Sequence, residues 1–329
     1  MNLLKTQREA LLGPLQAVTG IIERRHTLPI LSNVLLSRTD THIEFVATDI
    51  EIEITTSMTI EGPGETKKLT VGARKLVDIL RALPEGSEVT LALQDKRLQV
   101  KSGKSRFNLQ TLSAEDFPRL VLAEASATSL SVPQKLLKAL LGLVQYAMAQ
   151  QDIRYYLNGL LMVVEEGQLK LVATDGHRLA YASREVGGKN LPKQEVILPR
   201  KTIIELSKLL EDSDESVAIE LSSAQAKFKF GNVMLVSKLV DGKFPDYGRV
   251  IPQNHPKKLK LERIALLQAL QRAAILTSDK NTYRAPPWLK DTVGNMVARW
   301  RVVCVAEAAC QTGQTEWRTF RFARTRDYE

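Results

Sequence analysis

The chain has 329 residues, of which 44% are hydrophobic, and a formal net charge of +9 at pH 7. The length predicts two or three domains, and no apolar run is long enough for a transmembrane helix, which excludes a spanning segment. The basic balance favours a polyanionic partner, and a globular protein that merely has a high isoelectric point is the alternative.

The N-terminal segment and the cysteines predict the compartment. The segment MNLLKTQREALLGPL mixes acidic and basic residues and has no small-residue cleavage site, so we expect a mature cytoplasmic protein. Residues 1–280 contain no cysteine, which is typical of a reducing compartment and excludes a disulfide framework in that range.

The first part of the chain predicts two helices and about six to eight strands. One helix is expected over 6–17 and a second over 73–83, which ends at Pro84-Glu85-Gly86. Because strands and helices are segregated, we expect an α+β fold with two helices on one face of a sheet. The strands are expected at 32–38, 42–47, 51–55, 67–71, 88–93, 96–101 and 106–111.

The same pattern then returns as a second copy. Asn33 and the later Val46-Ala47-Thr48-Asp49 match Asn158 and Val172-Ala173-Thr174-Asp175. The second copy predicts helices over 133–149 and 199–210, and a third start is visible at 258–276. A repeat of domain size indicates duplicated domains rather than a solenoid. The expected domains are 1–126, 127–254 and a partial third over 255–329.

The composition changes abruptly near residue 281. All three tryptophans and both cysteines follow this point, and neither the strand nor the Thr-Asp turn of the repeat occurs where a third copy needs it. We therefore expect an out-of-frame or otherwise replaced C-terminus that is poorly ordered. A genuine small appended module is the alternative.

Each predicted helix carries a thin basic stripe opposite its apolar face. A solvated face is the ordinary explanation for one helix, but recurrence in each copy favours a shared basic surface. The residues are Lys135 and Lys138, Lys201 and Lys208, and Arg74 and Arg81.

The sequence offers little for catalysis, so we expect no enzyme, no metal and no cofactor. The four histidines lack zinc-site spacing, and Gly103-Lys104-Ser105 lacks the earlier glycine of a phosphate loop, so a hairpin turn is the better interpretation. The segment 174–178 brings Asp, His and Arg together without a nucleophile motif. Since 48–52 occupies the same place in the first copy, this turn is structural in origin, and binding is favoured over catalysis. The enzymatic alternative is a nuclease, but a nuclease would need clustered carboxylates to bind metal, and the sequence lacks such a cluster.

Three long motifs are more specific than these patterns. Residues 151–159 read QDIRYYLNG, 173–180 read ATDGHRLA, and 237–247 read SKLVDGKFPDY. Together with 27–31 and 105–107 they resemble the bacterial DNA polymerase III β subunit, the sliding clamp, over residues 1–280. The resemblance implies tandem DNA-clamp domains, each with two helices packed on antiparallel sheet, of which the third is incomplete here. It also implies a homodimeric ring, a processivity factor that encircles duplex DNA.

The resemblance implies three sets of site residues. The DNA contacts are Arg24, Gln151, Tyr155, Tyr156 and Lys201. The partner-peptide groove comprises Leu157, Thr174, Gly176, His177, Arg178, Leu179, Pro245, Arg249 and Val250. The ring interface joins Phe107 of one protomer to Ile275 and Leu276 of the next.

The implied partners are duplex DNA, the DNA polymerase III α subunit, the clamp loader and other proteins with a clamp-binding motif, with no membrane. The family is homodimeric, but the altered tail leads us to expect a monomer. The alternative function is therefore a truncated, non-ring clamp product that only binds DNA or partner peptides.

Overall fold

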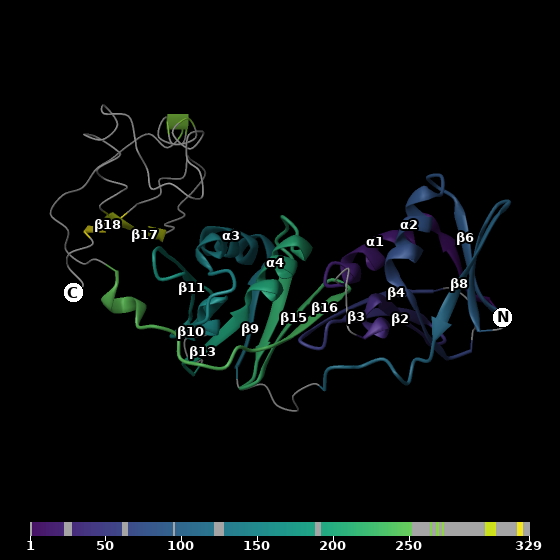
Figure 1. Cartoon of the computed structure of the whole chain (residues 1–329), viewed down its shortest axis with the longest axis horizontal. Coiled ribbons are helices and arrows are strands. Elements are labelled where there is room, and N and C mark those ends of the chain that lie inside the picture. The colour runs from purple at the N-terminus through teal and green to yellow at the C-terminus, as the bar shows by residue number, and fades with distance from the viewer. Residues whose placement is uncertain are drawn as a thin grey trace. The chain divides into compact units, whose positions relative to one another are not determined.

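The computed structural model describes residues 2–22, 28–60, 65–94, 96–121, 128–187, 192–251, 300–306 and 321–324, with Ile264, Gln268, Ala269 and Arg272 as single positions. Antiparallel strands dominate, with a few short helices among them (Figure 1), and this confirms the α+β class. Among the described residues, no helix is long and apolar enough to cross a membrane.

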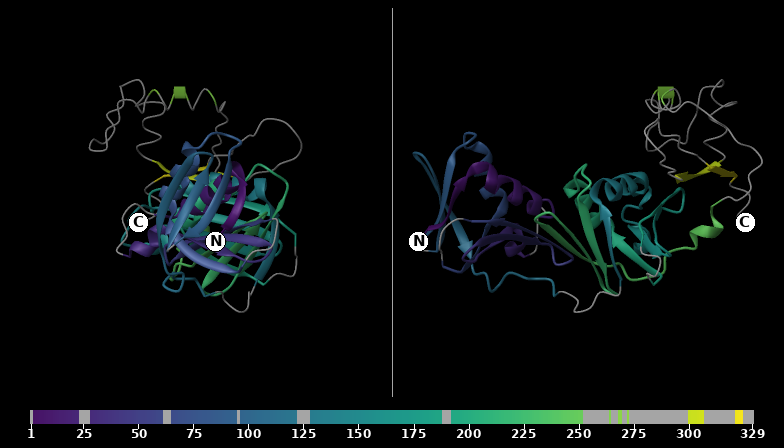
Figure 2. Two further views of the ribbon diagram at one scale, coloured as in Figure 1. Left: turned by 90° about the vertical axis from the view of Figure 1, so that its right-hand side faces the viewer. Right: turned by 180° about the vertical axis from the view of Figure 1, so that it is seen from behind.

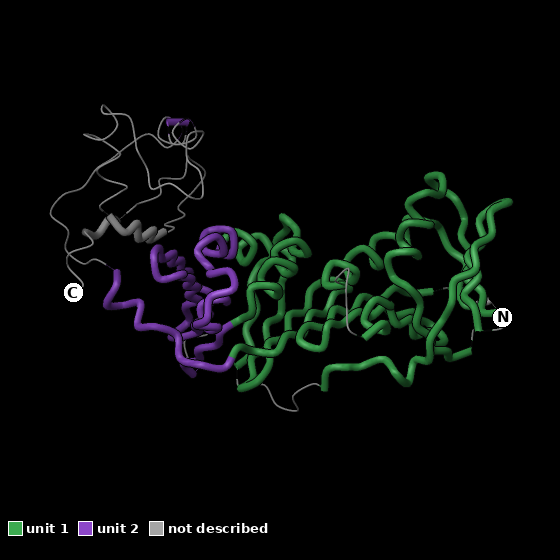
Figure 3. Tube along the Cα trace, viewed as in Figure 1, with its two compact units in different colours: residues 1–139, 198–240 green, residues 140–197, 241–329 purple. Residues whose placement is uncertain are grey.

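Two compact units make up the chain (Figure 3). The first comprises residues 1–139 and 198–240, and the second comprises residues 140–197 and 241–329. The repeat boundaries at 126 and 254 stay predictions.

The first unit is built on a twelve-stranded sheet in the order β1-β6-β7-β8-β5-β2-β3-β4-β16-β15-β14-β9. Strand β4 pairs antiparallel with β16, from Thr56 opposite Val233 to Ile52 opposite Ser237, so strands of both repeats share one sheet. The strands are β1 Asn2–Gln7, β2 Asn33–Arg38, β3 His42–Thr48, β4 Ile52–Thr59, β5 Lys67–Gly72, β6 Glu88–Gln94, β7 Arg97–Ser102, β8 Ser105–Leu112, β9 Thr128–Pro133, β14 Ser216–Leu221, β15 Gln225–Phe230 and β16 Val233–Lys238.

Amphipathic helices cover this sheet. Helix α1 (Arg8–Thr19) packs on α2 (Ala73–Ala82) and against β3 and β4, as Figures 1 and 2 show from several sides. Their buried faces present Leu11, Leu15 and Leu76 to the core, as the helical spacing predicts. The second repeat contributes two further helices, α3 (Gln134–Val144) and α4 (Arg200–Leu209). Two single helical turns are η1 (Pro29–Ser32) in the first repeat and η2 (Gln145–Ala147) in the second.

The second unit contains a six-stranded sheet in the order β13-β10-β11-β12-β17-β18. Its first four strands repeat the order β5-β2-β3-β4, which is the structural counterpart of the sequence duplication. The strands are β10 Gly159–Glu165, β11 Gln168–Thr174, β12 Leu179–Glu185, β13 Gln194–Pro199, β17 Trp300–Ala306 and β18 Arg321–Arg324, and the single turns are η3 Tyr155–Leu157 and η4 Tyr247–Arg249.

Three details differ from the sequence-based expectations. Strand β1 was missed, and α1 begins at Arg8 because residues 2–7 pair with β6 instead. Helix α3 ends at Val144, where the chain tightens into η2. The tail forms β17 and β18, although no strand was predicted there: the valine-rich segment WRVVCVA has high strand propensity and pairs between β12 and β18.

Candidate functional site

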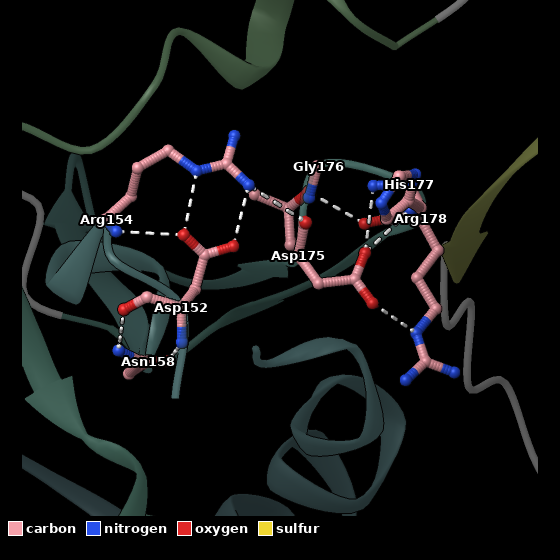
Figure 4. A network of polar contacts seen from close by, with 8 residues as sticks. Asp152, Arg154, Asn158, Asp175, Gly176, His177 and Arg178 are labelled. Atoms are coloured by element: carbon pink, nitrogen blue, oxygen red, sulfur yellow. Dashed lines mark hydrogen bonds and ion pairs between the residues drawn. The ribbon is translucent and has the colours of Figure 1, made fainter. Parts of the chain in front are cut away.

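The hairpin turn between β11 and β12 is stabilised by its own side chains. The Thr174 hydroxyl donates to the Arg178 carbonyl at 2.7 Å and accepts from the Gly176 amide at 3.1 Å. The Asp175 carboxylate accepts from the amides of His177 and Arg178, each at 2.9 Å (Figure 4). These short-range hydrogen bonds fix the turn without help from other segments.

The first repeat builds the same turn between β3 and β4. The Thr48 hydroxyl donates to the Ile52 carbonyl and accepts from the Ile50 amide, and Asp49 Oδ1 accepts from the amides of Glu51 and Ile52. The prediction that this turn is structural in origin is therefore correct: the two turns share their hydrogen bonds.

The two turns use their second carboxylate oxygen differently. Asp175 Oδ2 accepts from Arg178 Nε at 3.0 Å within its own turn, whereas Asp49 Oδ2 lies 2.5 Å from Lys201 Nζ on α4. Burial would raise the pKa of Asp175, but the amides of Arg178 and His177 hold that pKa below its ordinary value.

The upper face of the second-repeat turn is exposed. Gly176, His177 and Arg178 face solvent, and the Arg178 guanidinium lies 5.7 Å from the centre of the Tyr146 ring, in cation–π range. Leu157, Thr174 and Leu179, by contrast, are buried. The expected groove residues thus include both buried and exposed side chains.

The segment that carries Pro245, Arg249 and Val250 is attached to the same sheet by an aromatic pair. Tyr247 of η4 stacks on Tyr181 of β12, with ring centres 5.9 Å apart and an interplanar angle of 29°. Burial raises the pKa of Tyr247. Pro245 and Arg249 are exposed and Val250 is half-buried, so this segment offers a second surface of the same unit.

A loop that precedes β10 carries three of the expected DNA contacts. Gln151 adopts a left-handed backbone with φ 55°. Tyr155 and Tyr156 lie in the turn η3, not in a strand, and their rings meet edge to face at 5.9 Å. Neither ring is core: Tyr155 is exposed and Tyr156 is half-buried. The loop therefore presents a glutamine and an aromatic surface to solvent.

Polar contacts hold this loop in place (Figure 4). The Asn158 side chain accepts from the Asp152 amide at 2.9 Å and donates to the Asp152 carbonyl at 2.8 Å. Arg154 Nε and Nη2 donate to the two carboxylate oxygens of Asp152 at 3.0 and 2.8 Å. The guanidinium lowers the pKa of Asp152 to about 2. Sequence reasoning had singled out neither Asp152 nor Arg154.

The basic stripes are more neutralised than the sequence suggested. Lys135 pairs with Asp214, Lys208 with Glu205 and Lys201 with Asp49. Three of the four stripe lysines therefore have an acidic partner in the first unit.

The ring-interface residue Phe107 lies on a partly open strand. Strand β8 pairs with β7 over residues 105–110 but with β5 only at Thr111 and Leu112, so the described structure leaves one side of its earlier residues unpaired. Phe107 is 36% exposed there. An open edge of this kind can accept another strand. Arg24, Ile275 and Leu276 lie outside the described residues.

Comparisons with known proteins agree on one family. The family model "DNA polymerase III beta subunit, N-terminal domain" matches residues 2–121, and the model for the central domain of that subunit matches residues 131–246. The beta sliding clamp of Escherichia coli (strain K12) is 44% identical over 293 residues, which cover 88% of this chain and 80% of that protein. The beta sliding clamp of Proteus mirabilis is 46% identical over 275 residues, 83% of this chain and 74% of that protein.

Solved structures show the same likeness. The DNA polymerase III subunit beta from Pseudomonas aeruginosa has a TM-score of 0.79 and 43% identity, and the match covers 85% of this chain and 76% of that one. A sliding clamp from the same organism, bound to griselimycin, has a TM-score of 0.80 and 44% identity, with 84% and 75% covered.

Proposed function

The chain belongs to the DNA polymerase III β-subunit family, the sliding clamps, and on that premise we propose how its described residues perform a clamp's task. Its function is that of a DNA sliding clamp, a processivity factor in DNA replication that encircles duplex DNA and tethers its partners through a peptide groove. The observation that carries this conclusion is the 44% identity over 293 residues, together with family models that match residues 2–121 and 131–246, one in each repeat.

The proposed DNA contacts act on the phosphate backbone. A clamp that moves along DNA needs attraction without base recognition, because base contacts would stop it at particular sequences. Gln151 and Tyr155 suit this role because they are exposed on a loop whose shape is fixed by Asp152 and Asn158. We assign Tyr156, Lys201 and Arg24 to the same role from the family resemblance.

The proposed groove lies between the turn 174–178 and the segment 245–250. Its buried residues Leu157 and Leu179 suit apolar side chains, and the exposed side chains of His177 and Arg178 suit the polar atoms of a short linear peptide. A peptide with a glutamine followed by leucine and an aromatic residue is the expected ligand. His177 acts as a contact and not as a base.

Family membership supports three finer proposals, on the partners, the role and the compartment. The partners are the DNA polymerase III α subunit, the clamp loader and other proteins with the clamp-binding motif. The role is non-enzymatic and the compartment is the cytoplasm. Retention on DNA comes from enclosure, so each local contact can remain weak.

A labelled peptide of this type tests the groove. Fluorescence anisotropy should show binding to the full chain, and Gly176→Trp should weaken it because a large side chain would fill the turn. Lys193→Ala, which removes an exposed charge of the same unit that pairs with Glu165 and Glu195, is the matched control. Unchanged affinity in Gly176→Trp would place the peptide elsewhere.

The non-ring alternative has one observation in its favour. Strand β17 pairs with β12 in parallel, whereas β16 pairs antiparallel with β4, the strand that corresponds to β12 in the first repeat. The tail therefore does not reproduce the pairing that joins the first two repeats. Light scattering should give a monomer if the tail fails to complete a third clamp domain. A stable dimer would favour the ring.

A further inference from the structure

One side chain connects the tyrosine loop to the groove turn. Besides its two bonds to Asp152, Arg154 places Nη2 3.4 Å from the carbonyl oxygen of Asp175 (Figure 4). The loop thus contacts the turn through a guanidinium group, whose planar, multiply donating geometry suits two acceptors at once.

Gly176 is the residue that makes room for this contact. A Cβ at this position would lie 3.2 Å from Nη2 and 3.3 Å from Nη1 of Arg154. The backbone conformation alone does not demand glycine, because Ile50 occupies the same place in the first turn with φ 72°, against 86° at Gly176. The space occupied by Arg154 is therefore a second reason for a glycine in the second repeat, in addition to the left-handed backbone.

The loop end of this connection is also fixed. The Arg154 amide donates to Asp152 Oδ1 at 2.8 Å, and the Asn158 side chain closes on the Asp152 backbone. Asn33, the matching residue of the first repeat, donates instead to Thr70 Oγ1 at 3.1 Å. The asparagine at this repeat position therefore has different partners in the two repeats, and in the second repeat it holds the loop that carries Arg154.

We propose that Arg154 is a positioning residue that couples the tyrosine loop, residues 151–157, to the groove turn, residues 174–178. A contact made by the loop is then transmitted to the amides of Gly176, His177 and Arg178, and a contact made by the turn is transmitted back. What each side binds, duplex phosphate at the loop and peptide at the turn, rests on the proposed function. The coupling itself requires no ligand.

Amide hydrogen exchange of the full chain tests the coupling without a ligand. Arg154→Ala should speed exchange at Gly176, His177 and Arg178 by roughly tenfold, the size expected when a charge-assisted brace is lost. Lys193→Ala, which breaks ion pairs elsewhere in the same unit, should leave these amides unchanged. Equal exchange in wild type and Arg154→Ala would overturn the proposal, as would equal acceleration by both variants.

The reciprocal arm starts from the turn. Gly176→Ala should speed exchange at the amides of Asp152 and Arg154, because the new Cβ displaces the guanidinium. In the Arg154→Ala background, the same substitution should leave the Asp152 amide unchanged. An effect of equal size in both backgrounds would show that the disturbance does not travel through Arg154, which contradicts the proposal.

An experiment with both ligands separates this inference from the proposed function. Peptide affinity is measured with and without a short duplex, and the difference should be several-fold in wild type and absent in Arg154→Ala. If wild type binds no peptide, the proposed groove fails while the exchange result still decides the coupling. If peptide binds equally with and without duplex, transmission to the ligands is refuted.

Discussion

Ile50 and Gly176 occupy the same position in two copies of one turn, both with a left-handed backbone, φ 72° and 86°. The hydrogen bonds around them are the same, with a threonine hydroxyl on the amide of each residue. They differ in their neighbours: Arg154 fills the space beside Gly176. The second-repeat turn therefore has a neighbour, Arg154, at the position where the first-repeat turn carries the Ile50 side chain.

A matched pair of substitutions at these positions tests this difference. Gly176→Ala should lower the free energy of unfolding by about 1–2 kcal/mol, because a side chain there is both strained and close to Arg154. Ile50→Gly should not lower the free energy of unfolding by a similar amount, because it replaces a β-branched residue that is strained in a left-handed backbone. Urea unfolding measures both, and an unaffected Gly176→Ala would contradict the steric argument.

Much of this fold could be predicted from the sequence because the strands are rich in apolar residues between turn signals and the motifs occur twice. The repeated V-A-T-D segments identified the turns, and in both turns the threonine hydroxyl donates to the carbonyl four residues later. Strand β1 was missed because residues 2–7 lack alternation: Leu3 and Leu4 are both buried. Its assignment needs the partner strand β6, which is distant in sequence.

The site was predictable only in part. Family resemblance pointed to Gly176 and Tyr155, but not to Arg154, whose role depends on a contact with a turn that follows β11. The sequence signal that could have pointed to this contact is that one position of the repeat holds Ile50 in the first copy and Gly176 in the second. Lys201 was expected to be free for DNA, and its ion pair with Asp49 depends on β4 meeting β16, which periodicity cannot show.

The Lys201–Asp49 pair predicts a double effect of one substitution. Asp49 is only 10% exposed, so Lys201→Ala should lower the free energy of unfolding by about 1 kcal/mol as well as weaken DNA binding. Lys135→Ala is the control: its pair with Asp214 is exposed on both sides, so the stability change should stay within about 0.5 kcal/mol. Equal stability of the two variants would show that the Asp49 pair contributes nothing.

The Asp152 carboxylate provides a pH test of the loop. Its pKa is lowered from 3.8 to about 2, chiefly by Arg154, so its stabilising contribution is complete above pH 3.8 and is lost as pH falls toward 2. In Arg154→Ala the pKa of this carboxyl should rise toward its ordinary value, although the amide of residue 154 still donates to it. Carbon NMR between pH 7 and 3 should find Asp152 more protonated at pH 3 in the variant than in wild type. Coincident titration curves would show that Arg154 does not hold the carboxylate.

The most direct test of the clamp function is the salt dependence of binding to duplex DNA. Two unrelated duplexes of equal length are titrated with the full chain over a range of salt concentrations. The account predicts equal affinities for both sequences and a linear fall of log affinity with log salt, because the contacts are made to phosphates. A marked preference for one duplex, or binding that does not respond to salt, would contradict it.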